Sequence, residues 1–275
     1  MTERSKYSLI GAPDDEGVLN VGGRLGAALG PDSFRKIFSR FSGKRPVVRL
    51  GKDLGDVKTH RHLADWVRKA HQDIPLSIVV GGGHDLAFGH LLGLSEATGR
   101  ELNLGCINID AHLDVRKPNP KITSGSPFYL AIEEKVITPS RLVEFGIQSH
   151  CNSPALWEYV EKKKIEVILM EKLRDGKAVP AFCRALRKLA ARCDQIMVSF
   201  DLDAVACAHA PGVSAPQTEG FHPSEILRMM EFAGRMKKVI SLGIYELNPL
   251  FDVDQCTARL AATSAYHFLD ARIAE

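Results

Sequence analysis

Residues 106–115, CINIDAHLDV, carry three side chains that can bind a divalent metal ion. Asp110, His112 and Asp114 occupy every second position after an apolar run. In an extended chain, residues i, i+2 and i+4 lie on one face, so this spacing predicts that the three side chains converge. Buried carboxylates without a partner are costly, and a cation between these groups would remove that cost. We therefore expect a metal site at this segment.

Two other segments add side chains of the same kind: DLD contains two aspartates, and a histidine follows SIVVGGG. The predicted metal ligands are His84, Asp110, His112, Asp114, Asp201 and Asp203. Four carboxylates and two imidazoles are too many for one ion with an open position, but they suit two adjacent ions. An oxygen-rich ligand set favours Mn²⁺ over Zn²⁺, and two such ions would make a bridging water nucleophilic near neutral pH.

Each of these motifs alone also fits a plain structural role. GGGH is typical of a tight turn, and the two aspartates of DLD could be solvated at a strand end. The metal interpretation is favoured because polar residues follow four predicted strands, in GGGHD, NIDAHLD, SFDLDAV and GIYELNP. In parallel sheets, ligands bind beyond the carboxyl ends of the strands.

The elements that must position these residues alternate along the chain. Apolar runs rich in Val and Ile predict strands at 7–13, 76–83, 104–110, 141–148, 165–170, 195–203 and 238–246. Helical spacing predicts helices at 31–41, 60–73, 85–98, 153–164, 178–192, 222–236 and 257–273. NSPALWEYVEKKK also shows an Asn-Ser cap and an early proline. This alternation predicts an α/β fold, with a mostly parallel sheet between helices in a single domain, 1–275.

Composition excludes several classes of protein. The chain is 45% hydrophobic and 25% charged, and its net charge of +3 comes without a long basic block, which argues against nucleic-acid binding. No apolar run approaches the ~18 residues of a membrane span, and the first residues do not resemble a signal peptide. The six cysteines form no C-x-x-C pair, so we expect free thiols and a cytoplasmic protein.

Taken together, these motifs resemble the ureohydrolase superfamily of arginase, agmatinase and formimidoylglutamase. The resemblance covers nearly the whole chain through GAPDDEGVLNVGGRLGAALGP, GGGHDLAFGH, NIDAHLDVR, TSGSPF, DLDAVACAHAPGVSAP and GIYELNP. It implies an arginase-like three-layer α/β/α sandwich, and two Mn²⁺ ions on the six predicted ligands. It is also compatible with a homo-oligomer. The sequence departs from the pattern of many relatives at Ala206 and Cys207, where those relatives have Asp and Pro.

Within the superfamily, TSGSPF and APGVSAP are closer to formimidoylglutamase than to the other branches. The proton-shuttling histidine of arginases corresponds to Phe128. The resemblance places Glu246 beside the substrate nitrogens and Ser126 among the substrate contacts. Arg116 could bind a substrate carboxylate through its planar guanidinium, although a surface ion pair would explain it too. Arg24 is a second candidate, for which a structural role in its loop is at least as well supported.

The expected reaction is hydrolysis of a linear amidine that bears a carboxylate, with N-formimidoyl-L-glutamate giving L-glutamate and formamide. Asp114 and Glu246 are the predicted catalytic residues, and Asp114 would carry a proton from the nucleophile to the leaving nitrogen. The alternatives are an agmatinase or guanidino-acid ureohydrolase that releases urea, a zinc deacetylase of related architecture, and a metal-free regulatory relative.

Overall fold

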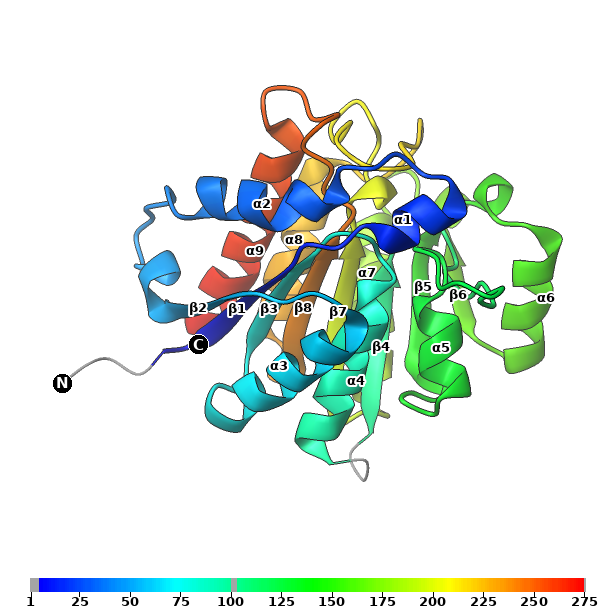
Figure 1. The fold of residues 1–275 in the computed structure, drawn as a ribbon, viewed down its shortest axis with the longest axis horizontal. Coiled ribbons are helices and arrows are strands. Elements are labelled where there is room, and N and C mark those ends of the chain that lie inside the picture. The colour runs from blue at the N-terminus through cyan, green and yellow to red at the C-terminus, as the bar shows by residue number, and fades with distance from the viewer. Residues whose placement is uncertain (1–4, 100–102, 275) are drawn as a thin grey trace.

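The computed structural model describes residues 5–99 and 103–274. In this part of the chain, eight strands form one sheet in the order β2-β1-β3-β8-β7-β4-β5-β6, and every pair of neighbours is parallel (Figure 1). The strands are β1 (Tyr7–Ala12), β2 (Gly51–Asp56), β3 (Ser77–Gly81), β4 (Leu104–Ile109), β5 (Leu142–Ile147), β6 (Glu166–Leu169), β7 (Gln195–Asp201) and β8 (Val239–Tyr245).

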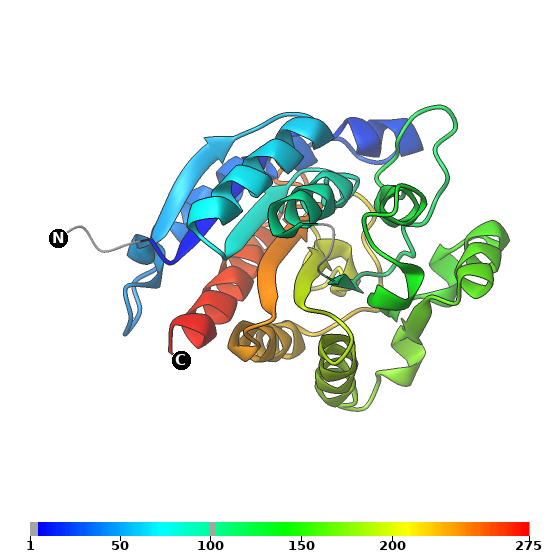
Figure 2. The ribbon, with the colours of Figure 1, turned by 90° about the horizontal axis from the view of Figure 1, so that it is seen from below.

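Helices cover both faces of this sheet, and Figure 2 shows the sheet between the two helical layers. One face packs against α3 (His60–Asp73), α4 (Leu86–Thr98), α5 (Pro127–Glu133) and α6 (Pro154–Lys163). The other face packs against α2 (Gly30–Phe38), α7 (Ala178–Ala190), α8 (Pro223–Arg235) and α9 (Cys256–Ile273). The short helix α1 (Glu16–Val21) lies across the carboxyl edge of the sheet (Figure 1). The predicted three-layer α/β/α fold is therefore confirmed.

All seven predicted strands and all seven predicted helices are present, with small differences at their ends. The sequence missed β2, because this edge strand, GKDLGD, is half-exposed and lacks an apolar run. It also missed α1 and α5, since helices of six and seven residues are shorter than two full turns and carry little periodicity. None of the helices in the described ranges is long and apolar enough to span a membrane.

The four central strands are β3, β8, β7 and β4, and their carboxyl ends lie next to one another. Their register pairs Val80 with Ile244, Ile244 with Phe200, and Phe200 with Ile109. These strands are buried on both faces, so packing holds their carboxyl ends in place. The chain segments that leave them are the four segments with the polar motifs, so the fold brings these motifs to one place.

Candidate metal centre

Two turns of the same kind build the centre. The carboxylate of Asp110 accepts a hydrogen bond from the backbone N–H of His112 at 2.7 Å, and Asp201 accepts one from Asp203 at 2.8 Å. A side chain that bonds two residues ahead closes a tight turn, which brings the second side chain back toward the first. The predicted extended alternation over 110–114 is wrong, because β4 ends at Ile109 and the chain then bends.

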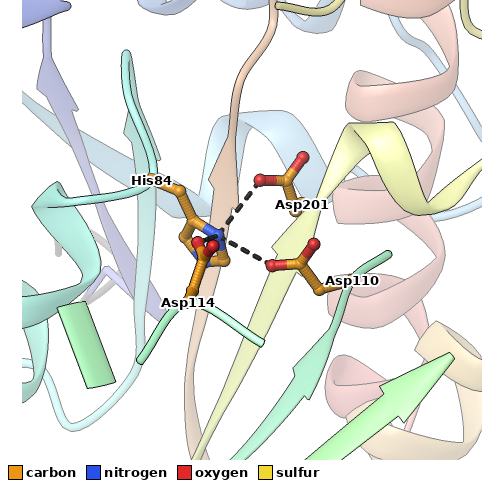
Figure 3. Close-up of side chains that lie close together, drawn as sticks. All are labelled: His84, Asp110, Asp114 and Asp201. Atoms are coloured by element: carbon orange, nitrogen blue, oxygen red, sulfur yellow. Dashed lines mark ion pairs between the residues drawn. The ribbon is translucent and has the colours of Figure 1, made fainter. Parts of the chain in front are cut away.

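His84 contributes an imidazole from the loop after β3. Its Nδ1 lies 3.1 Å from a carboxylate oxygen of Asp110, 2.9 Å from one of Asp114 and 3.0 Å from one of Asp201 (Figure 3). The Nε2 atom, on the other side of the ring, lies 2.8 Å from the hydroxyl of Ser199. When Nε2–H donates to Ser199, the lone pair of Nδ1 is left facing the three carboxylates.

A second group of side chains shares one carboxylate with the first. The other oxygen of Asp110 lies 3.5 Å from Nδ1 of His112, which in turn lies 3.0 Å from Asp203. The structure thus gives two adjacent sets of atoms that could hold a metal ion, and Asp110 belongs to both. The six predicted ligands come together, and their role in binding metal stays a prediction. The sets are His84, Asp110, Asp114 and Asp201, and Asp110, His112 and Asp203.

The electrostatics of the cluster favour added positive charge. Burial raises the pKa of Asp201 well above its usual range, and the carboxylates of Asp203 and Asp110 raise it further. Burial alone would lower the pKa of His84, but the three surrounding carboxylates outweigh it and raise this pKa well above the usual range. Nδ1 of His84 nevertheless has no well-formed hydrogen bond within the described part of the chain. A single N–H cannot serve three acceptors, so divalent cations fit this donor set better than protons do.

Asp114 and Glu246 have left-handed backbone conformations, with φ of 46° and 65°. Such conformations are costly for residues with a side chain, and they persist where the surrounding structure holds them. At Glu246 the backbone N–H donates to the carbonyl of Gly82 at 2.8 Å, and Oε1 accepts the backbone N–H of His84 at 2.9 Å. Its second oxygen, Oε2, is buried and has no well-formed hydrogen bond among the residues described, and the hydroxyl of Ser214 is close enough to the carboxyl group to lower its pKa.

Both carboxyl groups are buried enough to hold a proton more tightly than usual. Burial raises the pKa of Asp114 to about 6, with Asp110 adding to the effect. Burial also raises the pKa of Glu246 to about 8. A carboxylate with a free oxygen in a buried position is a strong site for a cationic group, because the cation restores its ionised form.

A cavity of about 130 Å³ opens above the cluster. Val18 and Val21 of α1, together with Leu156, contribute apolar side chains to its lining, which also includes Glu246 and five of the six predicted metal ligands. Arg116 also lines the cavity. Within 5–99 and 103–274, no carboxylate forms an ion pair with Arg116, so the surface ion pair considered from the sequence is not found.

Two residues considered from the sequence do not face the cavity. Ser126 is fully buried, and its hydroxyl bonds to Thr123 at 2.9 Å, which argues against the predicted substrate contact. Ser124 lines the cavity in its place. Arg24 donates to the carbonyl of Val213 at 2.5 Å, so its guanidinium holds a loop and the structural interpretation applies.

Sequence reasoning missed the role of Asn152. NSP was interpreted as a helix cap, but no side-chain cap bond forms at the start of α6. The amide of Asn152 accepts from the N–H of Leu113 at 2.8 Å and donates to the carbonyls of Ala111 and Gln148. These bonds fix the loop that carries His112. The only signal in the sequence is an asparagine one position before the cap.

The fold and this cluster agree with the comparison with known families. The model of the Arginase family matches residues 5–270, so the chain belongs to the arginase family. Two curated relatives are formimidoylglutamases. The protein of Staphylococcus carnosus (strain TM300) is 34% identical over 273 residues, covering 97% of this chain and 87% of the relative. That of Geobacillus kaustophilus (strain HTA426) is 34% identical over 266 residues, covering 93% and 80%.

Solved structures are also similar to this chain over nearly its whole length. Formiminoglutamase from Trypanosoma cruzi, with Mn²⁺₂, has a TM-score of 0.88 at 28% identity and covers 98% of this chain and 95% of that chain. Formimidoylglutamase from Bacillus subtilis has a TM-score of 0.89 at 24% identity, covering 100% and 90%, which shows the shared fold.

Proposed function

We propose that this chain hydrolyses N-formimidoyl-L-glutamate to L-glutamate and formamide with two Mn²⁺ ions. The observation that carries the proposal is one cavity in which a buried carboxylate–imidazole cluster, Glu246 and the unpaired guanidinium of Arg116 lie together. The cluster suits metal ions, Glu246 suits an amidinium and Arg116 suits a carboxylate. The formimidoylglutamases among the relatives support this choice of substrate.

The residues that would hold the two ions are the six of the cluster, with Asp110 shared between them. When bound, two Mn²⁺ ions supply positive charge beside the scissile carbon and lower the pKa of water there. The carboxylates keep this charge at the carboxyl edge of the sheet. The apolar side chains Val18, Val21 and Leu156 make part of the cavity lining apolar.

The substrate has a positive group and two negative groups, and the cavity offers a partner for each kind of charge. The free Oε2 of Glu246 accepts an N–H of the amidinium and so holds the scissile carbon next to the cluster. Arg116 donates two parallel hydrogen bonds to a substrate carboxylate. Agmatine carries no carboxylate, and Arg116 would repel its cationic tail.

Asp114 carries the proton in this proposal. Its carboxylate lines the cavity and takes a proton from the attacking water as the oxygen–carbon bond forms. It then gives this proton to the nitrogen of glutamate as the carbon–nitrogen bond breaks, and formamide leaves. Phe128 is fully buried, with its ring nearly perpendicular to the His84 ring, and a phenyl side chain at that position cannot deliver protons.

A substrate panel tests the proposal directly. The chain, loaded with Mn²⁺, is incubated separately with N-formimidoyl-L-glutamate, arginine, agmatine and guanidinobutyrate, and both formamide and urea are measured. We expect formamide from the first compound and no urea from the other three. Urea from any guanidine at a higher kcat/KM would contradict the proposal in favour of a ureohydrolase. Turnover without added metal, after exhaustive chelation, would contradict the role of the ions.

Three further expectations belong with this proposal. We propose a single domain, because one sheet contains strands from both ends of the chain. We propose a cytoplasmic location, which is supported by six free cysteines. The expected partner is the small-molecule substrate, with neither nucleic acid nor membrane, and self-assembly into a homo-oligomer is compatible with the family.

A further inference from the structure

The aromatic ring of Tyr245 lies against a metal-ligand candidate without taking part in the proposed chemistry. Tyr245 ends β8 and is fully buried. Its ring stacks on the imidazole of His84, with ring centres 4.9 Å apart and an angle of 27° between the planes. Phe128 packs nearly perpendicular to the same imidazole, with ring centres 5.6 Å apart and an angle of 87° between the planes. The plane of the imidazole is thus set by two aromatic neighbours.

Two glycines, which lack a side chain, make room for the side chain of Tyr245. A Cβ added to Gly81 in β3 would lie 2.5 Å from the Tyr245 ring, and one added to Gly243 in β8 would lie 2.4 Å from its hydroxyl oxygen. Side-chain atoms do not approach so closely, so any larger residue at either position would push the ring away. The small residues before His84 and before Tyr245 therefore allow the ring to lie flat on the sheet.

The hydroxyl of Tyr245 is held at its far end. It lies 2.8 Å from Nδ1 of His90, a fully buried histidine of α4. Nε2 of His90 lies 2.7 Å from the hydroxyl of Ser241, which continues to Ser77 at 2.6 Å and His71 at 2.8 Å. Five polar side chains in an otherwise apolar layer are costly unless each has a partner, and here each has one. This chain of hydrogen bonds anchors the ring.

We propose that Tyr245 is a positioning residue for His84, held by the hydrogen-bonded chain His90–Ser241–Ser77–His71. The inference rests on the proposed manganese-dependent function. The hydrogen bond to Ser199 fixes one point of the imidazole, and the stacked tyrosine fixes its plane. Together they point Nδ1 at the three carboxylates. Residues that orient metal ligands without touching the metal commonly change metal affinity by about 10–100-fold when replaced.

Two variants distinguish the contribution of ring stacking from that of the hydrogen bond to His90. Tyr245→Leu removes the stacking surface, and Tyr245→Phe keeps the ring but removes the bond to His90. We expect the Kd for Mn²⁺, measured by titration calorimetry on chelated protein, to rise about 10–100-fold in Tyr245→Leu and by less in Tyr245→Phe. Should Tyr245→Leu fail to fold, Tyr245→Phe and His90→Gln still give the comparison.

The matched control is Phe34→Leu. Phe34 is also a fully buried aromatic, stacked on Phe38, but it belongs to the core on the other face of the sheet. We expect a similar drop in Tm with unchanged affinity for Mn²⁺. If the Tyr245 variants lose stability and keep the wild-type Kd, the positioning role is overturned and the ring only fills space.

The failure of the proposed reaction is distinguishable from the failure of this inference. If the wild type binds Mn²⁺ but hydrolyses no substrate of the panel, the proposed substrate is wrong, while the Kd series still decides the role of Tyr245. If the wild type does not bind Mn²⁺, both proposals are overturned.

Discussion

The carboxylate of Asp114 has two roles in the proposal. It lies 2.9 Å from Nδ1 of His84 among the candidate metal ligands, and Asp114 also lines the cavity. Replacing it with asparagine keeps the size and removes the charge and the basicity. We expect Asp114→Asn to lower kcat by at least about 100-fold, as is typical when a general base is lost. Steady-state kinetics with saturating Mn²⁺ measures this, and an unchanged circular dichroism spectrum excludes unfolding. Near-normal turnover would refute the role of Asp114.

For Arg116, the structure favours contact with a substrate carboxylate over a surface ion pair. The sequence left open a surface ion pair, and the structure shows an unpaired guanidinium on the cavity wall. Asp110, His112 and Asp114 were identified by their types, while the bend that brings them together was not, because it depends on the hydrogen bond from His112 to Asp110.

Replacing Arg116 tests recognition of the carboxylate. We expect Arg116→Ala to raise KM for N-formimidoyl-L-glutamate by about 10–100-fold, since hydrogen bonds to charged groups contribute about 1.5–3 kcal/mol. An amidine without carboxylates, such as N-methylformamidine, should show the same kcat/KM with either protein. Arg116→Lys serves as the second variant, because an ammonium cannot bind both oxygens of a carboxylate in a fixed plane. Equal losses on both substrates would assign Arg116 a structural role.

At the scale of elements, the turn between β3 and α4 helps to position the residues of the site. The sequence predicted both elements and the turn between them, but it did not show how closely that turn packs. A Cβ at Gly82 would lie 2.0 Å from the carbonyl oxygen of Asp14, which is backbone and cannot move aside easily. The carbonyl of Gly82 also accepts the N–H of Glu246.

Gly82→Ala should therefore affect both stability and catalysis. We expect the free energy of unfolding to fall by about 1–3 kcal/mol, as for other overpacked sites, and kcat to fall because Glu246 shifts. Gly176→Ala is the control, since its Cβ would meet nothing within 4 Å and only its φ of 75° opposes the change. Urea denaturation and kinetics on both variants measure the difference. Equal kcat values in the two variants would contradict this account of the junction.

At the scale of the whole molecule, buried histidines make stability depend on pH. Burial lowers the pKa of His71 to about 4, compared with about 6.5 in an unfolded chain. Between these values the unfolded chain binds a proton at this histidine that the folded protein does not bind. The contribution of His71 is complete above the unfolded pKa, and it is lost as the pH falls toward the folded pKa.

Comparison with His71→Gln isolates this effect from the titration of the metal ligands. Between about pH 7.5 and about pH 5, we expect the wild type to lose about 1–2 kcal/mol more free energy of unfolding than the variant loses. Urea denaturation of both chelated proteins at the two pH values measures this difference. The same loss in both proteins would show that His71 is protonated equally in the folded and unfolded states.

The sequence by itself determined the alternation of strands and helices, the apolar core and the identity of the groups that end the central strands. These properties are local, since they depend on periodicity and on side-chain chemistry. It did not determine that β3, β8, β7 and β4 are neighbours, because their order in the sheet is set by contacts between distant segments. Only that order brings His84, Asp110, Asp201 and Glu246 together. The tertiary structure also decided that Ser126 is buried in the interior and that the exposed residue Arg116 lines the cavity, because the fold sets the position and direction of each backbone segment.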